Sequence, residues 1–179
     1  MDLEKLKYPI GKWSLPEVID SEMINAWIED IAGVPGLLSN LVNHGKEVNL
    51  ELTYRNGGWT IRQLVHHLAD SHINAYVRHK LAASEQTPTI NPYNEGLWSV
   101  MKDVKDVDVQ ISLQLLDALH QRWTVFLSSL SHEELKKSFF HPGHNRLITL
   151  GESIGMYSWH GKHHLAHIML ALGQGTIEI

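Results

Sequence analysis

The sequence has 179 residues, of which 43% are hydrophobic and 20% are charged, and its formal net charge is −5. This size and balance predict a single globular domain spanning residues 1–179, with two small domains as the alternative. The negative charge and the scattered basic residues are atypical of a nucleic-acid-binding surface. The absence of cysteine excludes disulfides, thiolate metal ligands and cysteine nucleophiles, so any metal must be bound by nitrogen or oxygen.

The sequence shows no sign of a membrane or secretory segment. No apolar run approaches the roughly 18 residues that a transmembrane helix needs. The opening residues, "MDLEKLKYPIGKW", lack the basic-then-apolar order of a secretory signal. We therefore expect a cytoplasmic protein that does not bind membranes.

Helical periodicity begins near residue 23. Apolar residues recur at steps of three and four between Met23 and Val42, which predicts an amphipathic helix. Pro35 interrupts this run, so the helix is either kinked there or built of two pieces. The second helix has a clearer start, because Thr60 and Gln63 have the spacing of a capping box after a Gly-Gly turn. Its apolar face continues to about residue 83.

The helical pattern lapses between residues 86 and 108. The segment "QTPTINPYNEGLW" holds prolines, asparagines and a glycine, which predicts a long ordered loop. Loops of this length are often functional or partly disordered. A third helix follows, with apolar residues on one side from Ile111 to Leu130, and "SHEEL" at 131–135 predicts a short helical turn.

The last helix is predicted between Thr149 and Gly173. Thr149 and Glu152 have capping-box spacing, and Gly173 is a typical residue after a helix end. Phe139–Phe140 and Ile177–Ile179 resemble strands but are too short to build a sheet. We therefore predict an all-α fold, a four-helix bundle with a long loop between helices two and three. Functional sites of such bundles lie between facing helices.

The last helix contains an unusual group of histidines, in "YSWHGKHHLAHI" at 157–168. At about 100° per residue, all four imidazoles lie on one side of the helix: His160, His163, His164 and His167. His160 and His164 stand one turn apart, and an i, i+4 histidine pair can chelate a single metal ion. Such an ion needs at least one more ligand, preferably from another element.

The second helix supplies candidates for that ligand in "VHHLADSH". On a helical wheel His67 lies beside the apolar stripe and is the predicted third ligand. The alternatives are His66, toward the back of the helix, and His72, on the other flank of the stripe. The same edge continues as a polar strip that could line a cavity: Ser71, Asn74 and Arg78. The spacing therefore predicts a metal site of His67, His160 and His164 between two helices.

Each of these residues also has a structural interpretation, because a single buried histidine is more often a hydrogen-bonded core residue than a ligand. His163 and His167 could hydrogen-bond a substrate, or His167 could be a satisfied partner in the bundle interior. Asp70, one helical step from His67, could orient its free nitrogen or be a solvated surface acid. The zincin motif H-E-x-x-H is a poor fit, because Gly161 stands where the glutamate base belongs.

Three segments carry a family resemblance: "YRNGGWTIRQLVHHLADSHINAYVRHKL", "TPTINPYNEGLW" and "YSWHGKHHLAHI". They resemble the DinB-like superfamily, specifically its YfiT-like branch, which includes metal-dependent hydrolases and bacillithiol S-transferases of Gram-positive bacteria. The resemblance implies a four-helix bundle with an atypical connection order, a nickel or zinc ion held by three histidines, and a dimer. It assigns the ligands to the histidine before "LAD", His67, and to both histidines of H-x-x-x-H, His160 and His164. The helical wheels gave the same three residues.

Three protein nitrogens leave coordination positions open, whereas closed structural sites use four protein ligands. In a hydrolase the ion would lower the pKa of a water, and His163, His167 and Asp70 are unranked candidates for a base. In a thiol transferase the ion would deprotonate a small thiol that attacks an electrophile. Three basic residues of the second helix could bind an acidic cosubstrate or be solvated surface charges: Arg62, Arg78 and Lys80.

From the resemblance we predict a bacillithiol-type S-transferase that acts on electrophiles, works as a homodimer and binds one zinc or nickel ion per subunit. The first alternative is a metal-dependent hydrolase. The second is a non-enzymatic protein that binds a metal or a small molecule. Neutral imidazoles accept several divalent ions, so the sequence does not select between zinc and nickel.

Overall fold

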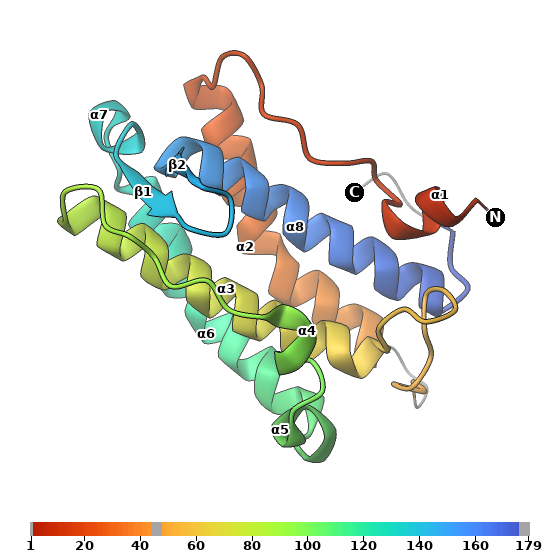
Figure 1. The fold of residues 1–179 in the computed structure, drawn as a ribbon. Helices are drawn as coiled ribbons and strands as arrows, with labels where there is room; N and C mark the ends of the chain where they lie inside the picture. Colours follow the sequence, from red (N-terminus) through yellow and green to blue (C-terminus); the bar gives the residue numbers. More distant parts are fainter. Residues whose placement is uncertain (1, 44–47, 176–179) are drawn as a thin grey trace.

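Four long helices form the body of the fold, which a computed structural model describes for residues 2–43 and 48–175 (Figure 1). They are α2 (Ser21–Asn43), α3 (Ile61–Ser84), α6 (Val109–Ser128) and α8 (Leu150–Ala171). Both α2 and α3 pack against α6 and α8, so these two consecutive helices lie at opposite corners. The predicted four-helix bundle is confirmed, and its order differs from that of an up-and-down bundle. None of the described helices is long and apolar enough to cross a membrane.

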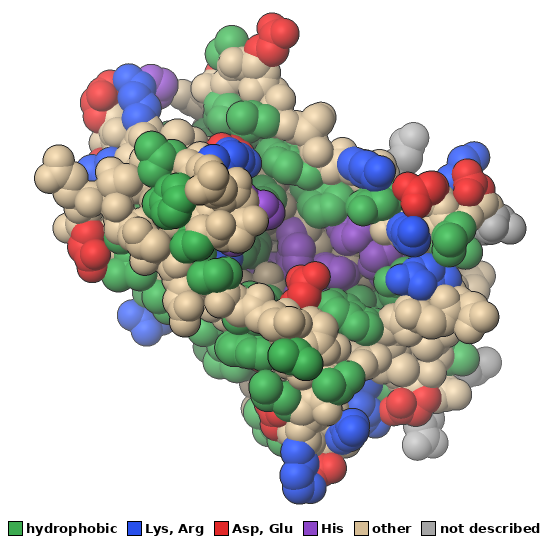
Figure 2. Space-filling model, in the orientation of Figure 1, with side chains coloured by type: hydrophobic (Ala, Val, Ile, Leu, Met, Phe, Trp, Pro, Cys, Tyr) green, Lys and Arg blue, Asp and Glu red, His purple; other side chains and the backbone are tan. Residues whose placement is uncertain are grey.

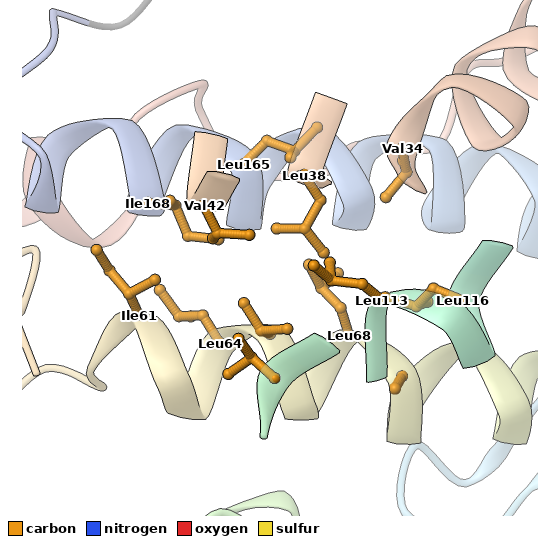
Figure 3. Packing of buried hydrophobic residues seen from close by; sticks show 13 residues of the cluster. Val34, Leu38, Val42, Ile61, Leu64, Leu68, Leu113, Leu116, Leu165 and Ile168 are labelled. Carbon is orange, nitrogen blue, oxygen red and sulfur yellow. The ribbon is translucent and has the colours of Figure 1, made fainter. Parts of the chain in front are cut away.

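An apolar core joins all four long helices (Figure 3). Almost completely buried leucines meet from each helix: Leu38 (α2), Leu64 (α3), Leu116 (α6) and Leu165 (α8). Burying one such side chain contributes about 1.5–3 kcal/mol. A second cluster, around Trp123 and Tyr157, continues the core along the bundle. This packing fixes the rotation of α3 and α8 about their axes and so decides which of their polar residues face one another.

The predicted start of α3 is confirmed by a complete capping box. The backbone N–H of Gln63 donates to the Thr60 hydroxyl at 3.2 Å, and the N–H of Thr60 donates to the Gln63 side chain at 2.9 Å. At the start of α8 only half of the predicted box forms: the N–H of Glu152 donates to Thr149. The Glu152 carboxylate instead binds the guanidinium of Arg146, because an ion pair is available there.

Pro35 lies inside α2, which runs without interruption through it. The alternative of two separate helical pieces is therefore wrong. Pro35 and Val34 are both buried against the bundle, and this packing holds the helix together despite the backbone hydrogen bond that proline cannot make.

The long connection between α3 and α6 is mostly irregular, as predicted. It also contains two short helices that the sequence analysis did not anticipate, α4 (Glu95–Trp98) and α5 (Lys102–Asp106). Asn94 begins α4, because its side chain accepts the backbone N–H of Leu97 at 3.0 Å. This connection runs along α3 on the face shown in Figure 1.

A two-stranded antiparallel hairpin, β1 (Ser138–His141) and β2 (Arg146–Thr149), precedes α8. The expectation that Phe139–Phe140 would form no sheet is therefore wrong. Phe139 pairs with Ile148, and both are buried in a small apolar cluster with Ile90 and Leu150. Tertiary packing thus stabilises strands that are too short to be stable alone. Ile177–Ile179, the other strand-like segment, lies outside the described residues.

Two further short helices complete the described fold: α1 (Leu3–Lys7) and α7 (His132–Leu135). The "SHEEL" turn is confirmed as α7, with a capping box between Ser131 and Glu134. The sequence analysis did not predict α1, which lies beside the C-terminal half of α8 (Figure 1).

Candidate metal centre

Three histidine rings converge between α3 and α8. One nitrogen from each of His67, His160 and His164 lies within 4.8 Å of the other two. The Nε2 atoms of His67 and His160 are 3.2 Å apart, and the ring of His164 stands almost perpendicular to both others. The structure thus brings together the three residues that the sequence analysis selected.

The cluster is largely buried but not sealed. His67 is 4% exposed and His164 is 8% exposed. The space-filling view shows histidine side chains on the floor of a hollow in this face of the molecule (Figure 2). The ring of Trp59 lies against the cluster, 4.7 Å from the centre of the His67 ring. A small molecule in the hollow could therefore reach the imidazoles while an aromatic wall limits access of water.

The separation of two of these nitrogens, those of His67 and His160, fits a metal ion. In a tetrahedral zinc site with Zn–N bonds of about 2.05 Å, neighbouring ligand atoms are about 3.3 Å apart. The 3.2 Å between the Nε2 atoms of His67 and His160 is close to that edge. Three imidazoles also suit nickel, since both ions accept neutral imidazole nitrogen. Within the described part of the chain, no carboxylate or fourth histidine joins this group.

A chain of hydrogen bonds decides which nitrogen of His160 is free. The carbonyl of Ile31 can only accept, so His120 donates to it from Nδ1 at 2.6 Å. Neutral His120 then accepts at Nε2 from Nδ1–H of His72, at 2.8 Å. His72 in turn accepts at Nε2 from Nδ1–H of His160, at 3.2 Å. With its proton on Nδ1, His160 presents the lone pair of Nε2 to His67.

A shorter chain has the same effect on His164. The backbone carbonyl of Lys7 accepts a hydrogen bond from Nε2–H of His167 at 3.2 Å. The Nδ1 of His167 therefore accepts from Nδ1–H of His164, at 3.4 Å. This leaves the lone pair on Nε2 of His164. Outer partners of this kind orient metal-binding histidines and fix their tautomers.

Burial keeps the cluster neutral. It lowers the pKa of His67 to about 4, and it lowers the pKa of His160 and of His164 well below the usual 6.5, with neighbouring imidazoles adding to the effect. Burial also lowers the pKa of His120 to about 4. Near pH 7 these rings are therefore unprotonated at one nitrogen, the form that binds a cation.

His163 lies next to the cluster and stacks on Trp159, with ring centres 4.4 Å apart. Its Nδ1 is buried and has no hydrogen-bond partner among the described residues. Burial lowers the pKa of His163 to about 3 and that of His167 to about 4. Both histidine candidates for a base are therefore weak bases near neutral pH.

The remaining candidates of α3 lie elsewhere. His66, which the helical wheel placed on the back of the helix, is buried against α6 and pairs with Ser112, with 2.8 Å between its Nδ1 and the hydroxyl. Asp70 makes no hydrogen bond to His67 in the described structure. Burial, aided by the carboxylate of Asp103, raises the pKa of Asp70 to about 6. The rings of the cluster are thus oriented by hydrogen bonds from neighbouring histidines and not by Asp70.

The sequence analysis missed His120. It is one turn after Leu116 and one turn before Trp123, within the apolar side of α6, and it is 2% exposed. A histidine at a core position of the facing helix is a signal that could have found it, because a buried imidazole needs hydrogen-bond partners.

Gly161 has a packing reason in this structure. A Cβ atom at this position would lie 2.6 Å from Cγ2 of Val34. The missing side chain therefore allows α8 to approach α2 closely, between the histidines at 160 and 163. Gly161, which stands where a zincin has its glutamate, therefore serves the contact between α8 and α2.

The fold and the cluster together define a class of protein: a helical bundle with an open three-histidine site between two of its helices. Comparison with known proteins agrees with this class. The family model described as the DinB superfamily matches residues 34–168. The chain belongs to the DinB superfamily and, by the similarities that follow, to its YfiT-like branch.

Relatives of known sequence and structure support this assignment. A Bacillus subtilis protein named "Putative metal-dependent hydrolase YfiT" is 47% identical over 163 residues, covering 91% of this chain and 92% of that protein. An Oceanobacillus iheyensis relative with the same enzyme designation is 48% identical over 162 residues, covering 90% and 93%. A solved structure of B. subtilis YfiT, described as "a probable metal-dependent hydrolase with an unusual four-helix bundle topology", matches with a TM-score of 0.89 and 44% identity. That match covers 95% of this chain and 99% of the other.

Proposed function

We propose that the chain is an enzyme that uses one divalent cation per subunit, zinc or nickel, bound by His67, His160 and His164. The observation that carries this proposal is the convergence of three neutral imidazoles with no fourth protein ligand in the described chain. Catalytic metal sites keep a position for substrate, whereas structural sites are closed by four protein ligands. When bound, the ion supplies Lewis acidity that lowers the pKa of a coordinated thiol or water.

The surrounding residues support transfer of a low-molecular-weight thiol, of the bacillithiol type, to an electrophile. Hydrolysis profits from a base whose pKa lies near the working pH, and both His163 and His167 have pKa values far below it. A coordinated thiol loses its proton without such a base. In the transfer a sulfur–carbon bond forms, the leaving group departs with its bonding electron pair, and the thiol proton goes to solvent.

The chain's own residues then orient the reactants. His72 and His167 hold the tautomers of His160 and His164, so that each ring keeps an Nε2 lone pair available for the cation. Trp59 covers one side of the cluster and limits water at the reacting centre. These contributions do not depend on which electrophile is used.

A hydrolase is the second candidate, and two observations favour it. The curated relatives bear that designation. The pKa of Asp70, raised to about 6, is close to the value expected of a base that works near neutral pH. Distinguishing the two reactions requires a direct assay.

The assay combines metal-loaded protein with bacillithiol and monochlorobimane and follows the fluorescence of the adduct, in which chloride has left. We expect turnover with the wild type, none above background with His160→Ala, and full activity with His132→Ala, a matched change at an exposed histidine of α7. Hydrolysis of a panel of esters by the same samples tests the alternative. No thiol transfer with zinc or nickel, together with ester hydrolysis that His160→Ala abolishes, would replace the transferase by the hydrolase.

From the resemblance we also propose that the chain is one domain, forms a homodimer and works in the cytoplasm. Light scattering coupled to size-exclusion chromatography tests the dimer. A mass equal to that of one chain at micromolar concentration would contradict it.

A further inference from the structure

Arg78 of α3 is a buried cation without a counter-ion. Its side chain is 8% exposed and forms no ion pair with any residue that the structure describes. Its Nε atom is buried without a hydrogen-bond partner. The other nitrogens make only long contacts, from Nη1 to the Tyr157 hydroxyl at 3.5 Å and from Nη2 to the Asn91 carbonyl at 3.4 Å.

Two other arginines of the chain have a carboxylate partner, whereas the half-buried Arg55 shares with Arg78 an unpaired Nε but donates from Nη1 to the Asn56 carbonyl at 3.1 Å. Arg62, also on α3, binds the carboxylate of Glu51 at 2.8 Å, and Arg146 binds Glu152. A guanidinium that is removed from water without a partner is costly to keep charged. Arg78 carries this cost although it is more deeply buried than either of them, which suggests that an external anion completes its surroundings.

The guanidinium lies close to the histidine cluster. It contacts the hydroxyl of Tyr157, and the ring of Tyr157 is 5.6 Å from the ring of His160, centre to centre. Arg78 also continues the edge of α3 that carries His67 and Ser71. An anion bound at Arg78 would therefore sit one aromatic ring away from the three imidazoles, along the same strip of α3.

The charge around Arg78 suits a single negative charge. Its neighbours His79 and His141 have pKa values lowered mainly by burial, and the nearby guanidinium lowers both further, so they add no positive charge near pH 7. Glu95 of α4 is exposed and acts on the pKa of Tyr157 from a distance, but it forms no ion pair with Arg78 in the described structure. One isolated guanidinium with a free Nε–H matches the two oxygens of a carboxylate.

We propose that Arg78 is a carboxylate-binding subsite, which holds the anionic end of a substrate while the reacting end lies at the histidine cluster. The binding of a carboxylate follows from Arg78 and its surroundings alone. The role of that carboxylate in catalysis rests on the proposed thiol transfer. The two parts need separate experiments.

Binding is tested by NMR on zinc-loaded protein, by following the side-chain Nε–H signal of Arg78 during titration with hexanoate. We expect a saturable shift of this signal, assigned by its loss in Arg78→Met, and no shift with hexanol. The matched signal of Arg62 should stay unchanged, since its Nε already binds Glu51. An unshifted Arg78 signal, or equal shifts at both arginines, would overturn the subsite.

Catalysis is tested with a pair of thiols that differ in charge, the acid 6-mercaptohexanoate and the alcohol 6-mercaptohexanol. The corresponding three-carbon and eight-carbon pairs vary the distance between the thiol and the carboxylate. We expect Arg78→Met to raise the KM for the matching acid by about tenfold to a hundredfold, the effect of losing one charge-assisted hydrogen-bonded contact. The KM for the alcohol and the kcat for both should change little. Arg62→Met should leave all values unchanged.

The outcomes separate the two proposals. If no thiol reacts with any loaded sample, the transferase proposal fails and the NMR titration still decides the subsite. If thiols react but Arg78→Met affects acids and alcohols equally, the subsite is wrong while the transferase stands. Arg78→Lys guards against misfolding: it keeps the charge but loses the planar fork, so it should show a smaller rise in KM for the acid only.

Discussion

Replacing His72 with phenylalanine is expected to weaken metal binding about tenfold to a hundredfold, the usual effect of removing an outer partner of a metal-binding histidine. His72 accepts a hydrogen bond from Nδ1–H of His160 at 3.2 Å and donates its own Nδ1–H to Nε2 of His120 at 2.8 Å. Without it, His160 either keeps a buried donor unpaired, at a cost of about 1–3 kcal/mol, or moves its proton to Nε2, where it blocks the metal. The expected loss corresponds to about 1.4–2.7 kcal/mol of binding free energy.

The measurement is a competition titration of apo protein against a chelator of known zinc affinity, at neutral pH. His79→Phe is the matched control, because His79 is also a completely buried histidine of α3 in contact with Trp123. It hydrogen-bonds Ser153 and the Trp123 indole rather than a histidine of the cluster. Its loss should lower the stability of the fold but leave the zinc affinity within about twofold.

A graded result is expected from His120→Phe. This change leaves the contact between His72 and His160 in place but removes the carbonyl-anchored partner that fixes the tautomer of His72. Zinc affinity should fall, by less than in His72→Phe. Long-range ¹⁵N–¹H spectra of the apo protein should show Nδ1–H at His160 in the wild type and a mixture in His72→Phe. Unchanged zinc affinity in His72→Phe, with His160 still protonated at Nδ1, would refute the chain as the cause of the tautomer.

Three further predictions concern stability. Gly161→Ala should lower the free energy of unfolding by about 1–3 kcal/mol, because the new Cβ would lie 2.6 Å from Cγ2 of Val34. Gly36→Ala, at a position of α2 with open space around it, should raise the free energy of unfolding by up to about 1 kcal/mol. Urea titrations measure both changes. The pKa of His79 in the folded protein is lowered to about 3, so between about pH 3 and 6.5 only the unfolded chain binds a proton at this residue. The free energy of unfolding therefore falls as the pH falls through this range. His79→Gln should reduce the slope of unfolding free energy against pH by about 1.4 kcal/mol per pH unit, and an unchanged slope would contradict the lowered pKa. The folded pKa of Asp70 is instead raised to about 6, so its contribution to stability falls as pH rises from about 4 to 6; Asp70→Asn should melt at a higher temperature than the wild type above pH 6 and at the same temperature below pH 4.

Local rules sufficed for the four long helices, for α7 and for one half of the site, but not for the short helices α1, α4 and α5. The Thr60–Gln63 capping box involves neighbouring residues only, and it forms as predicted. His160 and His164 share a side of α8 because the helical period alone decides that. Predictions that depended on distant residues were incomplete. The Glu152 side chain binds Arg146 of the hairpin and does not complete the capping box. Phe139 forms part of a strand because Ile148 and Ile90 pack beside it.

The histidines of α3 show the limit of a helical wheel. The wheel gave His67 the edge of the apolar stripe and His66 the back, yet both are buried, at 4% and 6% exposure. Helix α3 packs against α8 on one side and against α6 on another, so it has more than one buried side. A wheel shows angles around one axis and contains no information about which neighbour occupies each angle.

By itself, the sequence determined the approximate positions of the four long helices, the shared face of the four histidines of α8 and the lack of thiolate ligands, because these follow from short-range periodicity and from composition. Only the tertiary structure decided that His72 and His120 link His160 to a backbone carbonyl of α2, that His167 reaches Lys7, and that Arg78 lies buried without an acidic side chain beside it among the described residues. Each of these contacts, including that of Arg78 with the Asn91 carbonyl, joins residues at least 13 positions apart in the chain. They arise only when packing of the apolar core fixes the rotation and spacing of the helices.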